Sequence, residues 1–234
     1  MHVVQRGNNR MATFRTADDF LRYRQLLLQA SERFECAIHA YVLMTNHVHL
    51  LLTPPSTEAA SQMMQSLGTR YVRYVNRRHQ RTGSLWEGRF RSSVVDSENY
   101  LLTCARYIEL NPVRAAIVSS PDEYSWSSYR CNAYGAPDSL ITPHSVYQSL
   151  GSSSAERRLA YRALFARPIE STLDGIRDAL QTGAVLGARA LHDDVARSAP
   201  RAASRMRHGG DRRSNRFAVF KEPGSLIESR NPVP

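Results

Sequence analysis

The sequence predicts an α+β fold of the ferredoxin-like or RRM-like kind, an antiparallel sheet with helices on one face, followed by a C-terminal helical extension. Two observations predict this fold. Four short apolar segments, at residues 1–6, 36–44, 47–53 and within 84–96, have the length and composition of strands. Segments with helical periodicity separate the first strand from the second and the third from the fourth, and another such segment follows the fourth.

The first strand begins with the chain and ends in the turn-forming cluster 7–10. Because a core strand rarely starts at residue 1, we expect the ancestral N-terminus to lie upstream. Arg6 and Arg10 flank this glycine-containing loop, which makes them candidate contacts to a phosphate backbone. An ordinary solvated loop is an equal interpretation.

Two helices and a hairpin follow. The first helix begins with Thr16 as its N-cap and runs to about Arg33. The turn Thr45–Asn46 joins the second and third strands into a hairpin. The second helix covers about 57–80. Apolar residues form one stripe along it, and arginines occupy its other faces. Such a run of arginines indicates either a solvated face or a face that follows a phosphate backbone. These residues are Arg70, Arg73, Arg77, Arg78 and Arg81.

The segment 84–96 leads into the fourth strand and mixes aromatic and basic residues. Trp86 and Phe90 alternate there with Arg89 and Arg91. Aromatic rings beside arginines can stack on single-stranded nucleic acid and neutralise it, although either ring is equally suited to a core.

The third helix is expected from residue 98 to about residue 110, where Pro112 forces its end. Tyr107 and Asn111 are four residues apart, so we expect them to be neighbours on one face of this helix. A tyrosine packed on the sheet and a helix C-cap are the ordinary alternatives for these two residues.

Three parts are expected along the chain: an α+β domain at 1–118, a helical extension at 119–190, and a basic tail at 191–234. Within the extension the segments 145–150, 155–165 and 171–181 have helical patterns. The tail is rich in Arg, Ser, Ala, Gly and Pro and has few apolar residues, which predicts disorder.

Composition narrows the class of partner. The net charge is +10, with 31 Lys and Arg against 21 Asp and Glu, and nearly all the basic residues are arginine, which favours a polyanionic partner. The three cysteines are widely spaced, which argues against a disulfide framework or a cysteine zinc site and fits a reducing compartment. No apolar run approaches membrane-spanning length, so we expect a cytoplasmic protein without a membrane partner.

The third strand carries His47 and His49, separated by one valine. Side chains on a strand alternate between faces, so both imidazoles point the same way. Neutral imidazoles suit a divalent metal, but a His-x-His pair alone is more typical of half-buried polar residues.

Further segments change this interpretation. Asn-His-Val-His-Leu-Leu at 46–51, Leu-Trp-Glu-Gly-Arg-Phe at 85–90 and Arg-Tyr-Ile-Glu-Leu-Asn-Pro-Val-Arg-Ala at 106–115 occur in this order. The combination resembles the HUH-type single-tyrosine transposases, and among them the REP-associated tyrosine transposases, which are relatives of small insertion-sequence transposases. The segments 2–10 and 124–129 also resemble that family. The resemblance covers about residues 1–130 and continues more loosely to about 190.

The resemblance implies an HUH transposase domain whose nucleophile is Tyr107 and whose metal ligands are His47, His49 and Asn111. It further implies cleavage and rejoining of single-stranded, hairpin-containing DNA through a 5′-phosphotyrosine intermediate. Two nitrogens and one amide oxygen leave positions on Mg²⁺ or Mn²⁺ for phosphate and water. A monomer and a homodimer are both compatible with it. The candidate DNA contacts are Arg6, Arg10, Arg70, Arg73, Arg77, Trp86, Arg89 and Arg91.

Three rival functions remain open at this stage. A histidine-triad nucleotide hydrolase requires a third alternating histidine, and Leu51 stands in that position. A domesticated protein that binds hairpins without cutting them would use the same basic residues. A plasmid relaxase or replication initiator would share the chemistry, but the chain is short and the order of motifs fits the transposases better.

Overall fold

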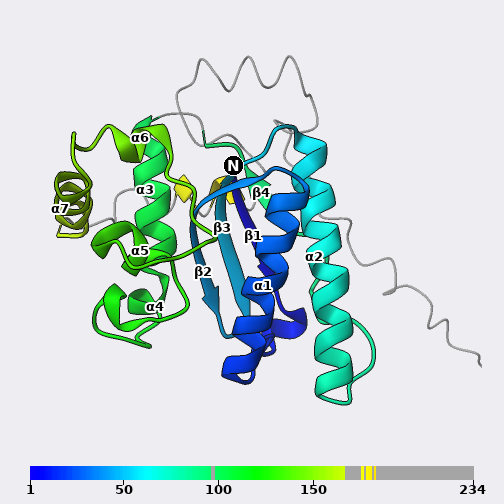
Figure 1. Ribbon diagram of the computed structural model, residues 1–234. Helices are drawn as coiled ribbons and strands as arrows, with labels where there is room; N and C mark the ends of the chain where they lie inside the picture. Colours follow the sequence, from blue (N-terminus) through cyan, green and yellow to red (C-terminus); the bar gives the residue numbers. More distant parts are fainter. Residues whose placement is uncertain (96–97, 167–174, 177, 181, 183–234) are drawn as a thin grey trace, which may run out of the picture.

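The computed structural model describes residues 1–95, 98–166, 175–176, 178–180 and 182. Four antiparallel strands form one sheet in the order β2-β3-β1-β4, which is the strand order of a ferredoxin-like fold (Figure 1). The predicted α+β architecture is therefore confirmed, including the two-residue hairpin between β2 and β3. The strands are β1 (His2–Arg6), β2 (Ala37–Met44), β3 (His47–Thr53) and β4 (Arg91–Ser93).

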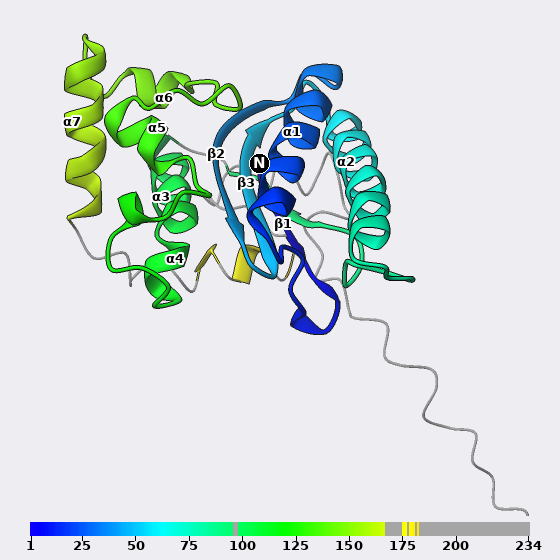
Figure 2. The ribbon, with the colours of Figure 1, turned by 60° about the horizontal axis from the view of Figure 1, so that its bottom comes forward.

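Helices α1 (Ala17–Arg33) and α2 (Thr57–Arg78) pack together on one face of the sheet (Figures 1 and 2). The alternate strand residues Val48, Leu50 and Leu52 point into the core beneath them. Because this face is mainly apolar, its burial supplies much of the hydrophobic driving force for the domain.

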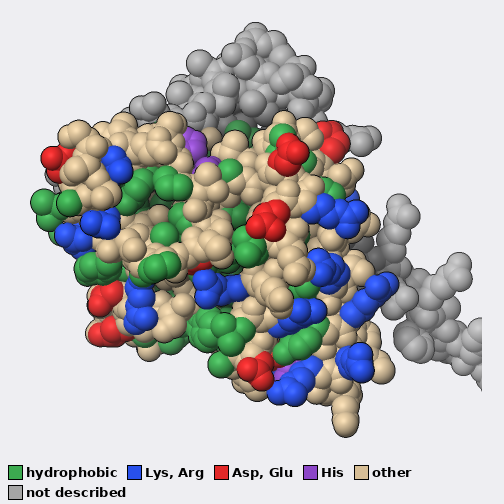
Figure 3. Space-filling view, viewed as in Figure 1, with side chains coloured by type: hydrophobic (Ala, Val, Ile, Leu, Met, Phe, Trp, Pro, Cys, Tyr) green, Lys and Arg blue, Asp and Glu red, His purple; other side chains and the backbone are tan. Residues whose placement is uncertain are grey.

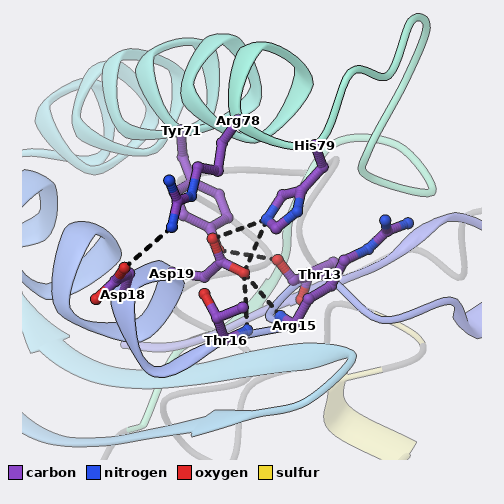
Figure 4. Close-up of polar contacts among 8 residues, drawn as sticks. All are labelled: Thr13, Arg15, Thr16, Asp18, Asp19, Tyr71, Arg78 and His79. Atoms are coloured by element: carbon purple, nitrogen blue, oxygen red, sulfur yellow. Dashed lines mark hydrogen bonds and ion pairs between the residues drawn. The ribbon is translucent and has the colours of Figure 1, made fainter.

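A buried polar cluster joins the start of α1 to the end of α2 (Figure 4). The carboxylate of Asp19 accepts hydrogen bonds from the backbone N–H groups of Arg15 and Thr16, at 2.8 and 3.0 Å. The same carboxylate contacts His79 Nε2 at 3.0 Å. Asp19 thereby satisfies N–H groups that the first turn of α1 leaves without helical partners, and it ties the two helices together.

The other face of the sheet, which carries the histidines, is covered by α3 (Glu98–Glu109) (Figure 2). Cys104, Ala105 and Ile108 of this helix pack on Ala40 and Val42 of β2. This third helix thus lies against the histidine face, and the sheet is buried on both sides rather than covered by helices on one face alone.

The chain after α3 adds short helices beside it and then covers the outer edge of β2. The backbone N–H of Leu43 donates to Trp126 O at 2.9 Å, and that of Ser128 donates to Tyr41 O at 3.0 Å. This cover satisfies polar groups that an exposed edge strand would leave open. The helical elements outside the core are η1 (Asn8–Arg10), α4 (Asn111–Arg114), η2 (Pro121–Glu123), α5 (Tyr129–Tyr134), α6 (Ser145–Gln148) and α7 (Ser154–Phe165).

The predicted helix at 171–181 is described only in part, and residues 175–176, 178–180 and 182 are helical. Ile176, Ala179 and Leu180 are buried against the α3 side of the sheet. The predicted basic tail at 191–234 lies outside the described residues. Among the residues that are described, no helix has the length and apolar character needed to cross a membrane.

Candidate active site

The start of β3 is held in place by the loop that follows β1. Thr45 O accepts the backbone N–H groups of Thr13 and Phe14, at 2.8 and 3.0 Å, and Asn46 O accepts that of Gly7 at 2.8 Å. A Cβ on Gly7 would lie 2.7 Å from the Thr13 Cγ2 atom, so glycine permits this close approach. The turn that leads directly into His47 is therefore fixed by its neighbours.

His47 and His49 lie on the same face of β3, and their ring centroids are 5.1 Å apart. His49 is buried, whereas His47 is half-buried. Burial lowers the pKa of His47 to about 4 and the pKa of His49 well below its ordinary value. Both imidazoles are therefore neutral near pH 7, which is the protonation state that a metal ligand requires.

The Nδ1 atom of each of these two imidazoles has a hydrogen-bonding partner. His47 Nδ1 lies 2.7 Å from Asn46 Oδ1, and His49 Nδ1 lies 2.9 Å from His2 Nε2. Both contacts suit the tautomer in which Nδ1 carries the proton and Nε2 offers its lone pair.

His2 belongs to this site although nothing in the sequence analysis singled it out. Its ring stacks on His49 with centroids 5.1 Å apart, and burial lowers its pKa to about 3. His2 pairs in register with Leu51, which places its side chain on the histidine face. The alternation of side chains along β1 could have suggested that His2 points to one face of the sheet. Only the pairing register between β1 and β3 shows that this is the face of His49.

Tyr107 projects from α3 onto the two buried imidazoles. Its ring meets His49 at 5.8 Å and His2 at 5.9 Å between centroids, both edge-on. Only 6% of the residue is exposed. On its other side, the Cζ atom of Arg114 lies 4.0 Å from the centroid of the Tyr107 ring. The predicted nucleophile and the predicted histidines are therefore brought together.

Asn111 reaches the site from a different element than expected. The prediction that Tyr107 and Asn111 share one helix is wrong, because α3 ends at Glu109 and Asn111 begins α4. Leu110 stands between them, and Pro112, whose ring disfavours a helical residue before it, follows at the start of α4. The Asn111 side chain nevertheless lies close enough to His47 to oppose, through hydrogen bonding, the lowering of the His47 pKa, so it joins the same cluster.

These residues fit a divalent metal ion through an unusual donor set. Within the described part of the chain, no three His, Cys, Asp or Glu side chains are grouped to hold a metal. His47 and His49 instead each use Nδ1 for a hydrogen bond within the protein, which leaves Nε2 as the ring nitrogen that a metal would meet, and the amide of Asn111 lies close to His47. Two imidazole nitrogens and an amide oxygen are acceptable ligands for Mg²⁺ or Mn²⁺.

Comparison with known proteins assigns the domain. Residues 1–111 match the family model described as "Transposase IS200 like". Over this region, which is just under half of the chain, the protein is similar to IS200-like transposases, and residues 1–111 are called the transposase domain for that similarity. The chain is also similar to a solved structure of a REP-associated tyrosine transposase bound to a REP hairpin, at 16% identity and a TM-score of 0.49, over 61% of this chain and 84% of that one. No curated protein matches the chain.

The family match confirms the recognition made from the sequence motifs, and it spans all four predicted site residues. The structure also weakens one rival. Leu51, which stands where a histidine triad needs its third histidine, is buried among apolar side chains below α3. That position in the transposase domain therefore serves the core.

Two predicted DNA contacts lie beside the histidines of the transposase domain. Arg6 pairs in register with His47, and its charge contributes, after burial, to lowering the pKa of His47. Arg91 pairs with Val4, which in turn pairs with His49, so Arg91 projects from the same face of the sheet. Both arginines are exposed.

The arginines of α2 lie on the opposite side of the sheet from Tyr107, where basic side chains gather over α2 (Figure 3). Arg70, Arg73 and Arg77 are exposed, and Arg70 donates to Gln29 Oε1 at 2.6 Å. They do not line the cluster of rings. Arg10 and Arg89 are exposed in the loops after β1 and before β4.

Trp86 of the transposase domain does not fit the predicted role of stacking on DNA bases. It is 7% exposed and packs against the rings of Tyr23 and Tyr71, with centroids 6.4 and 6.0 Å away. Its apolar body completes the core between the sheet and α2, so the core interpretation is correct.

Glu109, at the end of α3, joins the transposase domain to the helices that follow it. The fully buried carboxylate accepts hydrogen bonds from Ser128 Oγ at 2.6 Å, Asn132 Nδ2 at 2.9 Å and Tyr161 Oη at 2.7 Å. Burial raises the pKa of Glu109 to about 7, although these three donors oppose the shift. From the sequence Glu109 has no expected role, since it falls on another helix face than Tyr107 and Asn111, and its three partners are distant along the chain.

Proposed function

We propose that this chain is a single-tyrosine DNA transposase that cleaves and rejoins single-stranded, hairpin-containing DNA. One observation carries the proposal: the Tyr107 ring packs edge-on against His49, whose ring lies 5.1 Å from that of His47 between centroids, and Asn111 is close enough to His47 to affect its pKa. A tyrosine nucleophile beside neutral imidazoles and an amide is the set of side chains that metal-assisted phosphodiester cleavage needs.

In the proposed reaction, the Tyr107 oxygen attacks the phosphorus atom of the scissile phosphodiester. A bond forms between that oxygen and phosphorus, and the bond from phosphorus to the 3′ oxygen breaks. The 3′ oxygen leaves as a hydroxyl after gaining a proton, and the 5′ phosphate stays on Tyr107. Attack by another 3′-hydroxyl reverses these steps and releases the tyrosine. The covalent link preserves the bond, so no nucleotide cofactor is required.

His47 and His49 would hold a divalent cation through Nε2, and Asn111 would add its amide oxygen. When bound, Mg²⁺ or Mn²⁺ supplies a Lewis acid to the phosphate and favours ionisation of the attacking phenol. The protein's part is to present two imidazoles in one tautomer: Asn46 Oδ1 accepts the Nδ1 proton of His47, and His2 Nε2 accepts that of His49.

The proposed DNA interface has two parts. Arg6 and Arg91 are close enough to the histidines to meet the backbone beside the scissile phosphate. The arginines of α2 would contact DNA further away, in agreement with a hairpin stem that extends past the domain. Arg10 and Arg89 would add contacts from the connecting loops.

A covalent-adduct assay tests the proposal. Purified protein is incubated with labelled hairpin oligonucleotides and Mg²⁺ or Mn²⁺, and the products are separated on a denaturing gel. We expect a metal-dependent adduct that is absent in Tyr107→Phe and His47→Ala. Tyr100→Phe, which removes another hydroxyl from α3, is the matched control and retains the adduct.

Two outcomes would contradict the proposal. Tight hairpin binding without any covalent adduct in the unmodified protein would support a non-catalytic hairpin-binding protein instead. An adduct that persists in Tyr107→Phe would show that another residue is the nucleophile.

A further inference from the structure

Arg114 lies at the site, although the sequence motifs give it no role and it is not among the predicted DNA contacts. Its Cζ atom lies 4.0 Å above the centre of the Tyr107 ring, and the side chain is half-buried. Its charge contributes, after burial, to lowering the pKa of His2, His47 and His49. A permanent positive charge is therefore within electrostatic reach of every ring in the cluster.

The short helix α4 explains how the arginine arrives there. The backbone N–H of Arg114 donates to Leu110 O at 3.0 Å, and that of Ala115 donates to Asn111 O at 3.0 Å. Residues three apart on a helical turn share a face, so this turn presents Asn111 and Arg114 together. Asn111 reaches His47, while Arg114 covers Tyr107.

The position matters because of the charge that the substrate brings. A phosphodiester under attack by a phenolate gains negative charge on its non-bridging oxygens, and the neutral imidazoles and the amide contribute no positive charge against it. A guanidinium offers several N–H donors in a planar fork that matches phosphate oxygens, and it stays protonated throughout. Such a group, fixed in advance beside the nucleophile, stabilises the transition state more than the substrate.

We propose that Arg114 is a catalytic residue that binds the non-bridging oxygens of the scissile phosphate while Tyr107 attacks. This assignment rests on the proposed single-tyrosine reaction. It adds no bond-making step: Arg114 donates hydrogen bonds to the phosphate, and the bonds to phosphorus change as described above. The competing role is purely structural, in which the aliphatic stem of Arg114 packs on Tyr107 and holds its ring in place.

The test compares a natural oligonucleotide with one that carries a single methylphosphonate at the scissile position. The methylphosphonate removes the negative charge of that phosphate and leaves the 3′ oxygen as the leaving group. Arg114→Met keeps an apolar stem over Tyr107 without charge, and Arg114→Lys keeps the charge without the fork. Arg130→Met is the matched control, because Arg130 is exposed on α5.

On the natural substrate, we expect Arg114→Met to slow adduct formation by about 100-fold, as the loss of a transition-state donor does, and Arg114→Lys to slow it less. On the methylphosphonate, the rate of Arg114→Met should approach that of the unmodified protein, because the charge that Arg114 meets is gone. Arg130→Met should behave as the unmodified protein on both substrates.

Equal defects of Arg114→Met on the two substrates would overturn the proposal and establish the packing role. Equal rates for Arg114→Met and the unmodified protein on the natural substrate would also overturn it. Should Arg114→Met lose its folded circular-dichroism spectrum, Arg114→Gln, which is also uncharged, carries the same comparison. Failure of the single-tyrosine reaction itself is recognised separately, since the unmodified protein then forms no adduct on natural DNA.

Discussion

The imidazoles of His2 and His49 meet through their ring nitrogens, with His2 Nε2 2.9 Å from His49 Nδ1. In the tautomer that a metal requires, His49 donates its Nδ1 proton and His2 accepts it. We therefore predict that His2→Phe weakens Mn²⁺ binding by about tenfold to 100-fold, as the loss of a partner behind a metal ligand commonly does. Calorimetric titration with Mn²⁺ in the absence of DNA measures this effect.

His2→Gln should retain more affinity than His2→Phe, since its amide oxygen can accept the same proton. His144→Ala serves as the control, because His144 caps α6 and its ring meets that of His39 rather than the rings of His2 and His49. Equal Mn²⁺ affinity in His2→Phe and the unmodified protein would show that His2 has no part in orienting His49.

Asn111 provides a second prediction about the same site. Removal of its amide in Asn111→Ala should weaken Mn²⁺ binding, while Tyr107→Phe should leave that binding unchanged because the lost hydroxyl is not a ligand. Calorimetry distinguishes the two variants even when both fail to form an adduct. If Tyr107→Phe and Asn111→Ala lose Mn²⁺ affinity equally, the assignment of Tyr107 as nucleophile and Asn111 as metal ligand is incorrect.

Replacement of the buried Glu109 should lower the stability of the fold substantially. Glu109→Ala leaves the hydroxyls of Ser128 and Tyr161 and the amide of Asn132 without their buried acceptor. Because each unsatisfied buried donor is costly, we expect the free energy of unfolding to fall by about 3 kcal/mol or more. Urea denaturation measures the change, and Glu123→Ala, at an exposed position, is the control. A loss no larger than that of the control would show that the network contributes little.

The stability of the fold should depend on pH through the ionisation of Asp19. Burial alone raises its pKa, but hydrogen bonds from His79 and from the backbone of Arg15 and Thr16 outweigh burial, so the pKa lies below its ordinary value of 3.8. A carboxylate with a lowered folded-state pKa stabilises the fold above its unfolded-state pKa, and this stability is lost as the pH falls through the folded-state pKa.

Asp19→Asn should accordingly reduce the free energy of unfolding by about 2 kcal/mol at neutral pH, the size of a charge-assisted hydrogen bond. The difference from the unmodified protein should shrink once the pH drops below the folded-state pKa. Urea denaturation at a series of pH values measures it. A constant difference across the series would show that the ionised form of Asp19 is unimportant.

Local sequence patterns were sufficient for most elements of the core. Thr16 and Asp19 mark the start of α1, which begins at Ala17, and the turn Thr45–Asn46 defines the hairpin as it occurs. These signals act through hydrogen bonds within a few residues, so they are visible without knowledge of the fold.

The remainder of the site depended on contacts between distant parts of the chain. His2 reaches His49 only because β1 and β3 pair in one particular register. Glu109 finds partners in α5 and α7, and the break at Leu110 directs Arg114 back onto Tyr107. Periodicity cannot specify such contacts, because each requires two elements to be placed relative to each other.

The strip of chain around Trp126 that closes the outer edge of β2 has a practical consequence. The family match ends at residue 111, yet the backbone partners of Tyr41 and Leu43 lie beyond it. A recombinant fragment cut at the end of the match would expose a long apolar edge that readily pairs with other chains. The unit that is recognised by sequence is thus smaller than the unit that covers its own sheet edge, and expression trials should retain the chain through α7.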